Sequence, residues 1–235
     1  MLQAILFDLD GTLLPMDNDY FTKYYFKFLA RDAYQWGYTD TDALIKAVWL
    51  GVEAMVKNDG KRSNFDAFWD VFSAIVGRDG RQDVDKFAEF YRTSFHKAKD
   101  ATGEAPLARE AVALAREKAG KVILATNPIF PEEADESRLS WIGLKMEDFD
   151  LVTDMSNSGY CKPNPDYYKA ILAQFGLEPE HCLMVGNNAT EDWQAASAAG
   201  IPCYLVMDNL INTENLEITC PHGSYADMVE YLRNL

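Results

Sequence analysis

The chain has 235 residues, of which 48% are hydrophobic and 25% are charged, so it is long enough to bury one large core or a core and a smaller second unit. Its net charge of −15 at pH 7 argues against nucleic acid as a partner, because binding a phosphate backbone needs clustered Lys and Arg. No segment approaches the roughly 18 consecutive apolar residues of a membrane span. The N-terminus shows no signal-peptide pattern, so we expect no membrane association and a cytoplasmic protein.

The first predicted element is a short strand of residues 4–7, which is apolar on both faces, as in the centre of a parallel sheet. Asp8 and Asp10 follow this strand, and Gly11 lets the chain turn away. Side chains two residues apart in an extended chain point the same way, so we expect the two carboxylates to face one site. Close carboxylates repel unless a proton or a cation joins them, which predicts a nucleophile and an acid/base beside a divalent metal.

Residues 17 to about 100 contain apolar side chains at helical spacing and no convincing strand. Four helices are predicted, beginning near residues 17–18, 41, 63 and 84. Because their connections are short, we expect four antiparallel helices that form a small bundle. Most of the aromatic side chains in this part are expected to pack within that bundle.

From Ala105 onward, predicted helices and strands alternate along the chain. The strands are expected at residues 121–125, 149–152, 182–185 and 203–206, and the helices at residues 106–119, 132–141, 164–175, 193–199 and 225–232. This alternation predicts an α/β fold with a doubly wound parallel sheet. The helical part of the chain would then be an insertion after the first strand.

Three polar residues stand at points where they can reach the end of the first strand. Thr126 and Asn127 follow the strand of residues 121–125, where a hydroxyl and backbone N–H groups can bind phosphoryl oxygens. Lys162 precedes Pro163 in a loop stiffened by proline, and it can bring a compact positive charge to Asp8. Each of these motifs alone is weak evidence for a site.

Taken together and in this order, four motifs resemble those of the haloacid dehalogenase-like (HAD) hydrolase superfamily. They are Asp8-Leu9-Asp10-Gly11-Thr12, Thr126-Asn127, Lys162-Pro163 and the segment from Gly186 to Asp192. The resemblance covers the whole chain and implies a Rossmann-like core domain with a smaller, all-helical cap domain. The core would comprise residues 1–15 and 103–235 and the cap residues 16–102, with hinges near residues 14–17 and 100–105.

The resemblance implies a Mg²⁺-dependent phosphatase that hydrolyses a small phosphorylated metabolite through an aspartyl-phosphate intermediate. Asp8 would be the nucleophile, and Asp10 would protonate the leaving group and then activate water. Lys162 would supply positive charge in catalysis and would bind the substrate together with Thr126 and Asn127.

The resemblance also implies a magnesium site, and here the sequence departs from the family's pattern. The expected ligands are Asp8, Asp10, Asn187 and Asp192, but Asn187 stands where the family usually has an aspartate. An amide oxygen can bind Mg²⁺ without a formal charge, so the affinity should fall. Whether Asn187, Glu191 or Asp192 completes the metal shell stays open.

Three alternatives remain beside the phosphatase. A phosphomutase of the same superfamily would share the nucleophile, and a weakly active or non-catalytic HAD-like binding protein is an alternative because of Asn187. A dehalogenase is disfavoured because dehalogenases of this family lack the second aspartate of the first motif, which is present here as Asp10. The physiological substrate and the oligomeric state are not predicted.

Overall fold

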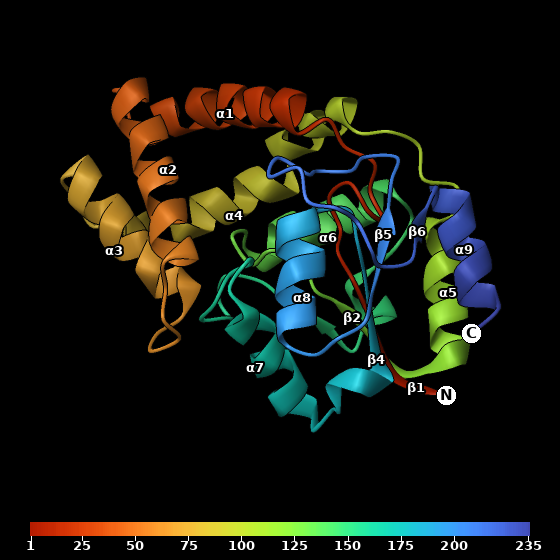
Figure 1. The fold of residues 1–235 in the computed structure, drawn as a ribbon. Coiled ribbons are helices and arrows are strands. Elements are labelled where there is room, and N and C mark those ends of the chain that lie inside the picture. Colours follow the sequence, from red (N-terminus) through yellow and green to blue (C-terminus); the bar gives the residue numbers. More distant parts are fainter.

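The structure, a computed structural model, describes residues 1–235 and contains a six-stranded sheet in which every neighbouring pair of strands is parallel (Figure 1). The strand order is β3-β2-β1-β4-β5-β6, so the chain winds outward in both directions from β1. The strands are β1 (Leu2–Phe7), β2 (Ala119–Leu124), β3 (Leu151–Val152), β4 (Cys182–Gly186), β5 (Cys203–Val206) and β6 (His222–Gly223). The predicted α/β fold class with a doubly wound parallel sheet is confirmed.

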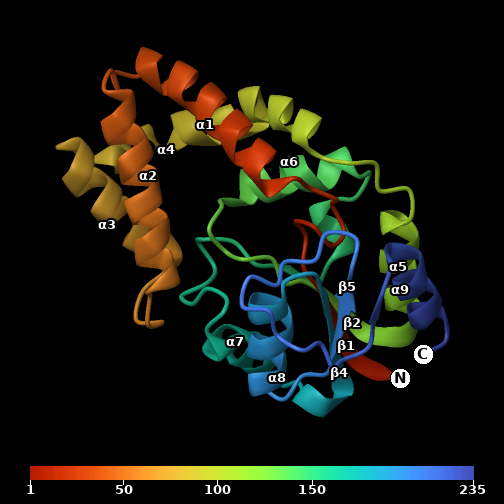
Figure 2. The same cartoon turned by 45° about the horizontal axis from the view of Figure 1, so that its top comes forward.

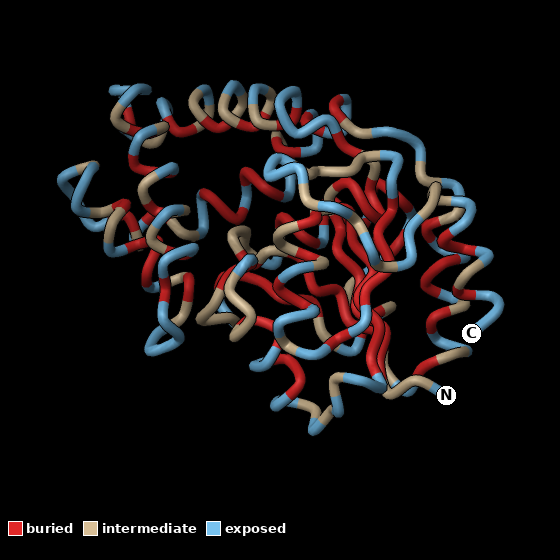
Figure 3. Tube along the Cα trace, viewed as in Figure 1, coloured by how far each residue is buried: buried red, intermediate tan, exposed pale blue.

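The sheet is covered by helices on both faces, and this explains why β1 is apolar at successive positions. Ile5 and Phe7 belong to one buried cluster, which includes side chains of α5 (Ala108–Lys118) and α9 (Tyr225–Arg233). Ala4 and Leu6 belong to a second cluster with α7 (Pro165–Phe175) and α8 (Ala195–Ala198). The strands therefore lie in the most buried part of the trace (Figure 3).

Two boundaries in the core differ from the prediction. Strand β2 begins at Ala119, so Gly120 lies within the strand and does not terminate the preceding helix as predicted. After β4 the chain winds into a π-helix (Ala189–Gln194) before α8, which is earlier than the predicted start at residue 193. Asn188 explains the early start, because its side chain accepts hydrogen bonds from two N–H groups in the first turn.

The four inserted helices begin within one residue of their predicted positions, and side chains cap three of them. They are α1 (Asn18–Gln35), α2 (Thr41–Val56), α3 (Asn64–Val76) and α4 (Val84–Arg92), with 3₁₀-helices at Gly80–Asp83 and Ser94–Ala101. Asp17, Asp40 and Ser63 each accept a hydrogen bond from a backbone N–H in the first turn of α1, α2 and α3. None of the helices in the chain combines the length and apolar composition needed to cross a membrane.

The helices pack differently from the predicted bundle of four antiparallel helices. Helices α2 and α3 lie side by side, α1 packs along the segment of residues 94–101, and α4 packs against α6 (Glu132–Trp141) of the core (Figures 1 and 2). The aromatic faces of α1 and α4 also contact the core, because Phe21 and Tyr91 both pack edge-on against Phe130. The apolar faces of these two helices are thus buried against the core as well as against other helices.

The two segments that join the helical part to the sheet lie next to each other. Met16 and Thr102 form an antiparallel bridge, and the Gly103 N–H donates to the Pro15 carbonyl at 2.8 Å. These contacts fall at the two predicted hinges. The division into core and cap domains, and closure about these hinges, stay proposals.

Candidate active site

The register of the sheet brings the ends of three strands to the same level. Phe7 of β1 pairs with Leu124 of β2 and with Val185 of β4, and the carboxyl ends of parallel strands meet at one edge. The residues that follow these strand ends therefore come together, as the sequence predicts. They are Asp8, Thr126 and Asn187.

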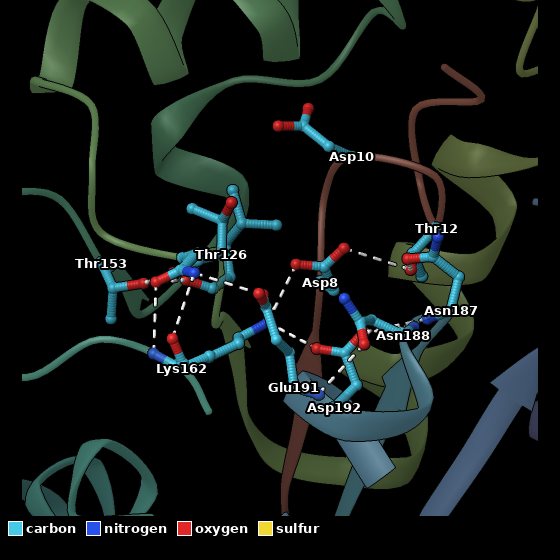
Figure 4. Close-up of polar contacts among 12 residues, drawn as sticks. Asp8, Asp10, Thr12, Thr126, Thr153, Lys162, Asn187, Asn188, Glu191 and Asp192 are labelled. Carbon is cyan, nitrogen blue, oxygen red and sulfur yellow. Dashed lines mark hydrogen bonds and ion pairs between the residues drawn. The ribbon is translucent and has the colours of Figure 1, made fainter. Parts of the chain in front are cut away.

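Lys162 lies between two buried carboxylates at this edge (Figure 4). Its Nζ donates to Asp8 Oδ1 at 2.9 Å and to Asp192 Oδ1 at 2.6 Å, and its side chain is fully buried. Burial lowers the pKa of Lys162, but the carboxylates of Asp192 and Asp8 outweigh that effect and hold the pKa well above its usual range. The ammonium therefore stays charged and binds Asp8, which lies 154 residues away in the sequence.

The pKa of the Asp8 carboxyl group is raised towards neutral pH. Burial raises the pKa of Asp8 to about 7, with the negative charges of Asp192 and Asp10 adding to the rise and Lys162 opposing it. The Thr12 hydroxyl lies 3.3 Å from the second Asp8 oxygen. A further cation beside this carboxylate would favour its ionised form, which is the form that acts as a nucleophile.

Asp192 holds the ammonium in place and is itself fixed by backbone groups. Its Oδ2 accepts hydrogen bonds from the N–H groups of Asn187 at 3.0 Å and Asn188 at 2.9 Å. A Cβ at Gly186 would lie 2.3 Å from the Asp192 carboxylate, so glycine is required there for this close approach. Both carboxylate oxygens of Asp192 thus have partners in the protein: Oδ1 binds the Lys162 ammonium and Oδ2 binds two backbone N–H groups.

Asn187 places its side-chain oxygen beside Asp8. The Thr12 hydroxyl, which lies near Asp8 Oδ2, is 3.0 Å from Asn187 Oδ1, and Asn187 Nδ2 donates to the Asn209 carbonyl at 2.7 Å. The approach is possible because residue 11 is glycine with a φ of +87°, where a Cβ would lie 2.2 Å from Asn187 Nδ2. A carboxylate and an amide oxygen facing one hydroxyl are hard oxygen donors of the kind that suits Mg²⁺.

The Asp10 side chain lies beside Asp8 but makes no hydrogen bond to Lys162 (Figure 4). Its Oδ2 pairs with Arg138, and its Oδ1 is buried without a hydrogen-bond partner. Asp8 and Asp10 thus have different partners, since β1 ends at Phe7 and the chain turns at Gly11. Burial raises the pKa of Asp10, and Arg138 opposes that rise.

Arg138 is a site residue that the sequence analysis missed. It lies on α6, is fully buried, and pairs with both Asp10 and Asp135. Burial raises the pKa of Asp135 to about 8, with Arg138 opposing the rise. The available signal was its spacing, because Ala134, Arg138 and Trp141 recur at i, i+4 and i+7 on the buried side of the helix.

Thr126 and Asn127 lie at the same carboxyl edge of the sheet and are held there by hydrogen bonds. The Thr126 carbonyl accepts from the Thr153 hydroxyl at 2.7 Å, and residue 126 is buried. Asn127 Oδ1 accepts from the Lys162 N–H at 3.2 Å, and its Nδ2 donates to Glu191 Oε2 at 3.2 Å. Asn127 thereby ties the lysine loop to Glu191.

The chain is similar over most of its length to known hydrolases. A family model described as haloacid dehalogenase-like hydrolase matches residues 2–200. Phosphoglycolate phosphatase of Rhodospirillum rubrum is 31% identical over 214 residues, which cover 88% of this chain and 80% of that protein. Glyceraldehyde 3-phosphate phosphatase of Methanothermobacter thermautotrophicus is 36% identical over 66 residues, and this match spans only 29% of that relative. The crystal structure of a HAD phosphatase from Thermococcus onnurineus has a similar fold, with a TM-score of 0.63, 17% identity and 98% of both chains covered.

Proposed function

Because the chain belongs to the haloacid dehalogenase-like hydrolase family, we propose that it is a Mg²⁺-dependent phosphatase that hydrolyses a small phosphorylated metabolite through an aspartyl-phosphate intermediate. The observation that carries the proposal is the buried Lys162 ammonium between Asp8 and Asp192 at the carboxyl edge of the sheet. Phosphoryl transfer needs a nucleophile and positive charge beside the transferring group. Asp8 and Lys162 supply these two requirements at one place.

The reaction proceeds in two displacements at phosphorus. First, an Asp8 oxygen attacks the phosphorus, the bond from phosphorus to the leaving alcohol oxygen breaks, and Asp10 gives its proton to that oxygen. Second, a water oxygen attacks the phosphorus while Asp10 takes a proton from the water. The bond from phosphorus to Asp8 then breaks, which releases inorganic phosphate and restores both carboxyl groups.

Asp10 is suited to the acid role by its surroundings. Burial raises the pKa of Asp10, which helps it hold a proton, and its Oδ1 has no partner within the protein. Arg138 holds the other oxygen, so we propose Arg138 as a positioning residue for the acid. Asp135 holds Arg138 in turn.

For the metal, we propose that the Asp8 carboxylate, the Asn187 amide oxygen and the Asp10 main-chain carbonyl hold Mg²⁺. Bound there, the ion adds positive charge beside the phosphoryl oxygens. The Asp10 side chain is engaged by Arg138, and the Asp192 side chain, which is also a predicted ligand, is engaged by Lys162. We therefore assign them to proton transfer and to positioning of the lysine.

For the substrate, we propose that the Thr126 hydroxyl and the Asn127 N–H bind phosphoryl oxygens together with the Lys162 ammonium. Support comes from their place at the end of β2, beside the strand end that carries Asp8. The hydrogen bonds of the Asn127 side chain to the Lys162 N–H and to Glu191 hold these groups in position.

The test is phosphate release from 4-nitrophenyl phosphate with and without Mg²⁺. We expect Mg²⁺-dependent release, and a loss of kcat of at least roughly a thousandfold in Asp8→Asn, with folding checked by circular dichroism. Asp42→Asn, an exposed residue of α2, is the matched control and should keep full activity.

Other outcomes would point elsewhere. Isomerisation of a sugar phosphate without net phosphate release would indicate a phosphomutase. Tight binding of phosphate esters with no turnover at saturating Mg²⁺ would indicate the non-catalytic binding protein. Metal-independent halide release from 2-haloacids would indicate a dehalogenase.

A further inference from the structure

A cavity of about 250 Å³ lies between the inserted helices and the carboxyl edge of the sheet, beside Asp10. Residues of α1, α2, α3 and α4 line it on one side, and Ile129, Phe130 and Pro131 line it from the core. Trp49, which is half exposed, stands among the lining residues. The cavity therefore adjoins the group that we assign as the acid of the reaction.

The lining of this cavity is apolar and carries no positive charge. Of its 22 residues, 17 are hydrophobic, and none is Lys, Arg or His. Its aromatic part comes from both sides and includes Phe21, Phe26, Phe68, Trp69, Phe87 and Phe130. An anionic group placed here would lose its hydration, and the cations behind the lining, Arg138 and Arg92, already pair with carboxylates.

The acidic groups and the tyrosine hydroxyls of the lining have partners in the protein, whereas Asp10 Oδ1 and the uncharged Asn18 and Thr22 side chains have none. The two acidic residues are Asp10 and Glu133; Asp10 pairs with Arg138, and Glu133 accepts from Arg92 Nη2 at 2.8 Å. The hydroxyls of Tyr25 and Tyr91 are hydrogen-bonded to each other at 3.0 Å. Since each lining carboxylate already has an arginine partner, the cavity offers little negative charge to a cationic ligand.

From these observations we propose that the substrate is a phosphate monoester of an uncharged, apolar alcohol, whose hydrocarbon part occupies this cavity. The inference rests on the proposed phosphatase function. It follows from the position of Asp10, because the acid must adjoin the oxygen that links phosphorus to the alcohol, so the alcohol extends into the space that Asp10 lines. A cavity of about 150 Å³ holds benzene, so the space suffices for an aromatic ring with its linking atoms.

The proposal sets this chain apart from relatives that act on small anionic substrates. The leaving group of phosphoglycolate, the substrate named for the Rhodospirillum rubrum relative, carries a carboxylate. That carboxylate would enter the apolar lining unpaired. The chain should therefore favour a hydrophobic ester over phosphoglycolate, although the two proteins are 31% identical.

The experiment compares kcat/KM with saturating Mg²⁺ for benzyl phosphate, 2-phosphoglycolate, phosphocholine and acetyl phosphate. We expect benzyl phosphate to exceed both 2-phosphoglycolate and phosphocholine by about tenfold to a hundredfold, because its ring leaves water for an apolar site. Equal or better turnover of either charged ester would overturn the inference. Acetyl phosphate tests the proposed function alone, because it has neither a ring nor a charge outside its phosphate.

A second measurement does not depend on turnover. Benzylphosphonate and phosphonoacetate share the phosphonate and differ in the ring or the carboxylate. Calorimetry should give at least about tenfold tighter binding of benzylphosphonate. If no ester is hydrolysed, the proposed function fails, and these two affinities still decide the inference.

Two substitutions on α2 locate the effect. Val52 lines the cavity, whereas Val56 lies one turn further along and is exposed. Val52→Lys should reduce the ratio of benzyl phosphate to 2-phosphoglycolate kcat/KM by at least about tenfold, and Val56→Lys should leave it unchanged. Val52→Gln adds polarity without charge and should lower the ratio in the same direction if the lysine variant does not fold. An unaltered ratio in the folded Val52 variants would contradict the assignment of the cavity.

Discussion

Replacing Asn187 with aspartate restores the charge that the family usually has at this position. The structure predicts two opposed effects, a lower stability without metal and a higher affinity for Mg²⁺. Asn187 is buried, and its Nδ2 donates to the Asn209 carbonyl at 2.7 Å. In Asn187→Asp an oxygen would face that carbonyl and the donor would be lost. The same substitution adds a negative charge beside Asp8, where we place the magnesium ion.

The magnitudes follow from the contacts. Leaving the partly buried Asn209 carbonyl without its donor costs about 1–3 kcal/mol. One kcal/mol shifts the melting temperature of a chain of this size by about 2–4 °C, so Asn187→Asp should lower Tm by about 2–12 °C without metal. A tenfold gain in Mg²⁺ affinity is worth about 1.4 kcal/mol, so saturating Mg²⁺ should raise Tm by about 3–6 °C more in the variant than in the wild type.

The assay combines thermal unfolding, with and without Mg²⁺, and calorimetric titration of Mg²⁺. Asn188→Asp is the matched control, because it adds the same charge one residue away. The Asn188 Oδ1 accepts from the N–H groups of Thr190 and Glu191, a role that aspartate fills equally well. If Asn187→Asp and Asn188→Asp changed the Mg²⁺ affinity equally, or if neither changed it, residue 187 would not be a metal ligand.

Two further predictions concern stability. The buried Asp83 carboxylate accepts hydrogen bonds from Tyr38 Oη at 2.8 Å and from Lys86 Nζ at 2.6 Å. Burial alone would raise the pKa of Asp83, but these partners outweigh the effect of burial and hold the pKa below its usual 3.8. A carboxyl whose folded-state pKa is lowered stabilises the protein above its unfolded pKa, and this stability is lost as the pH falls through the folded pKa. Asp83→Asn should therefore cost about 1–3 kcal/mol in urea unfolding at pH 7, and its difference from the wild type should shrink below about pH 4; a pH-independent difference would refute the reasoning. Arg138→Met leaves the buried Asp135 and the partly buried Asp10 carboxylates without their cation, so it should cost about 3–5 kcal/mol. An unchanged Tm would show that these two ion pairs do not stabilise the protein.

Local sequence signals predicted the elements well where local chemistry decides them. Asp17 and Ser63 mark helix starts because their side chains cap the first turn, and Gly77 ends α3 in the left-handed conformation that glycine adopts readily. The meeting of Asp8 with Lys162 was also predictable, because the motif order placed both at the carboxyl edge of the sheet.

What the sequence did not predict depends on contacts between distant residues. The direction of the Asp10 side chain is set by the turn at Gly11 and by Arg138, which lies 128 residues away. The packing of the inserted helices depends on the aromatic surface that Phe130 and its neighbours offer on the core. Periodicity identifies an apolar face, but it does not say which surface will cover that face.

The bridge between Met16 and Thr102 has a consequence for how the inserted helices could be replaced. Because the Pro15 carbonyl and the Gly103 N–H are only 2.8 Å apart, the helices enter and leave at a single junction that a tight turn could replace. An insert of a different shape could be grafted at this junction without altering β1 or Lys162. We therefore expect chimaeras at this junction to exchange substrate preference while the bond-breaking groups stay in place.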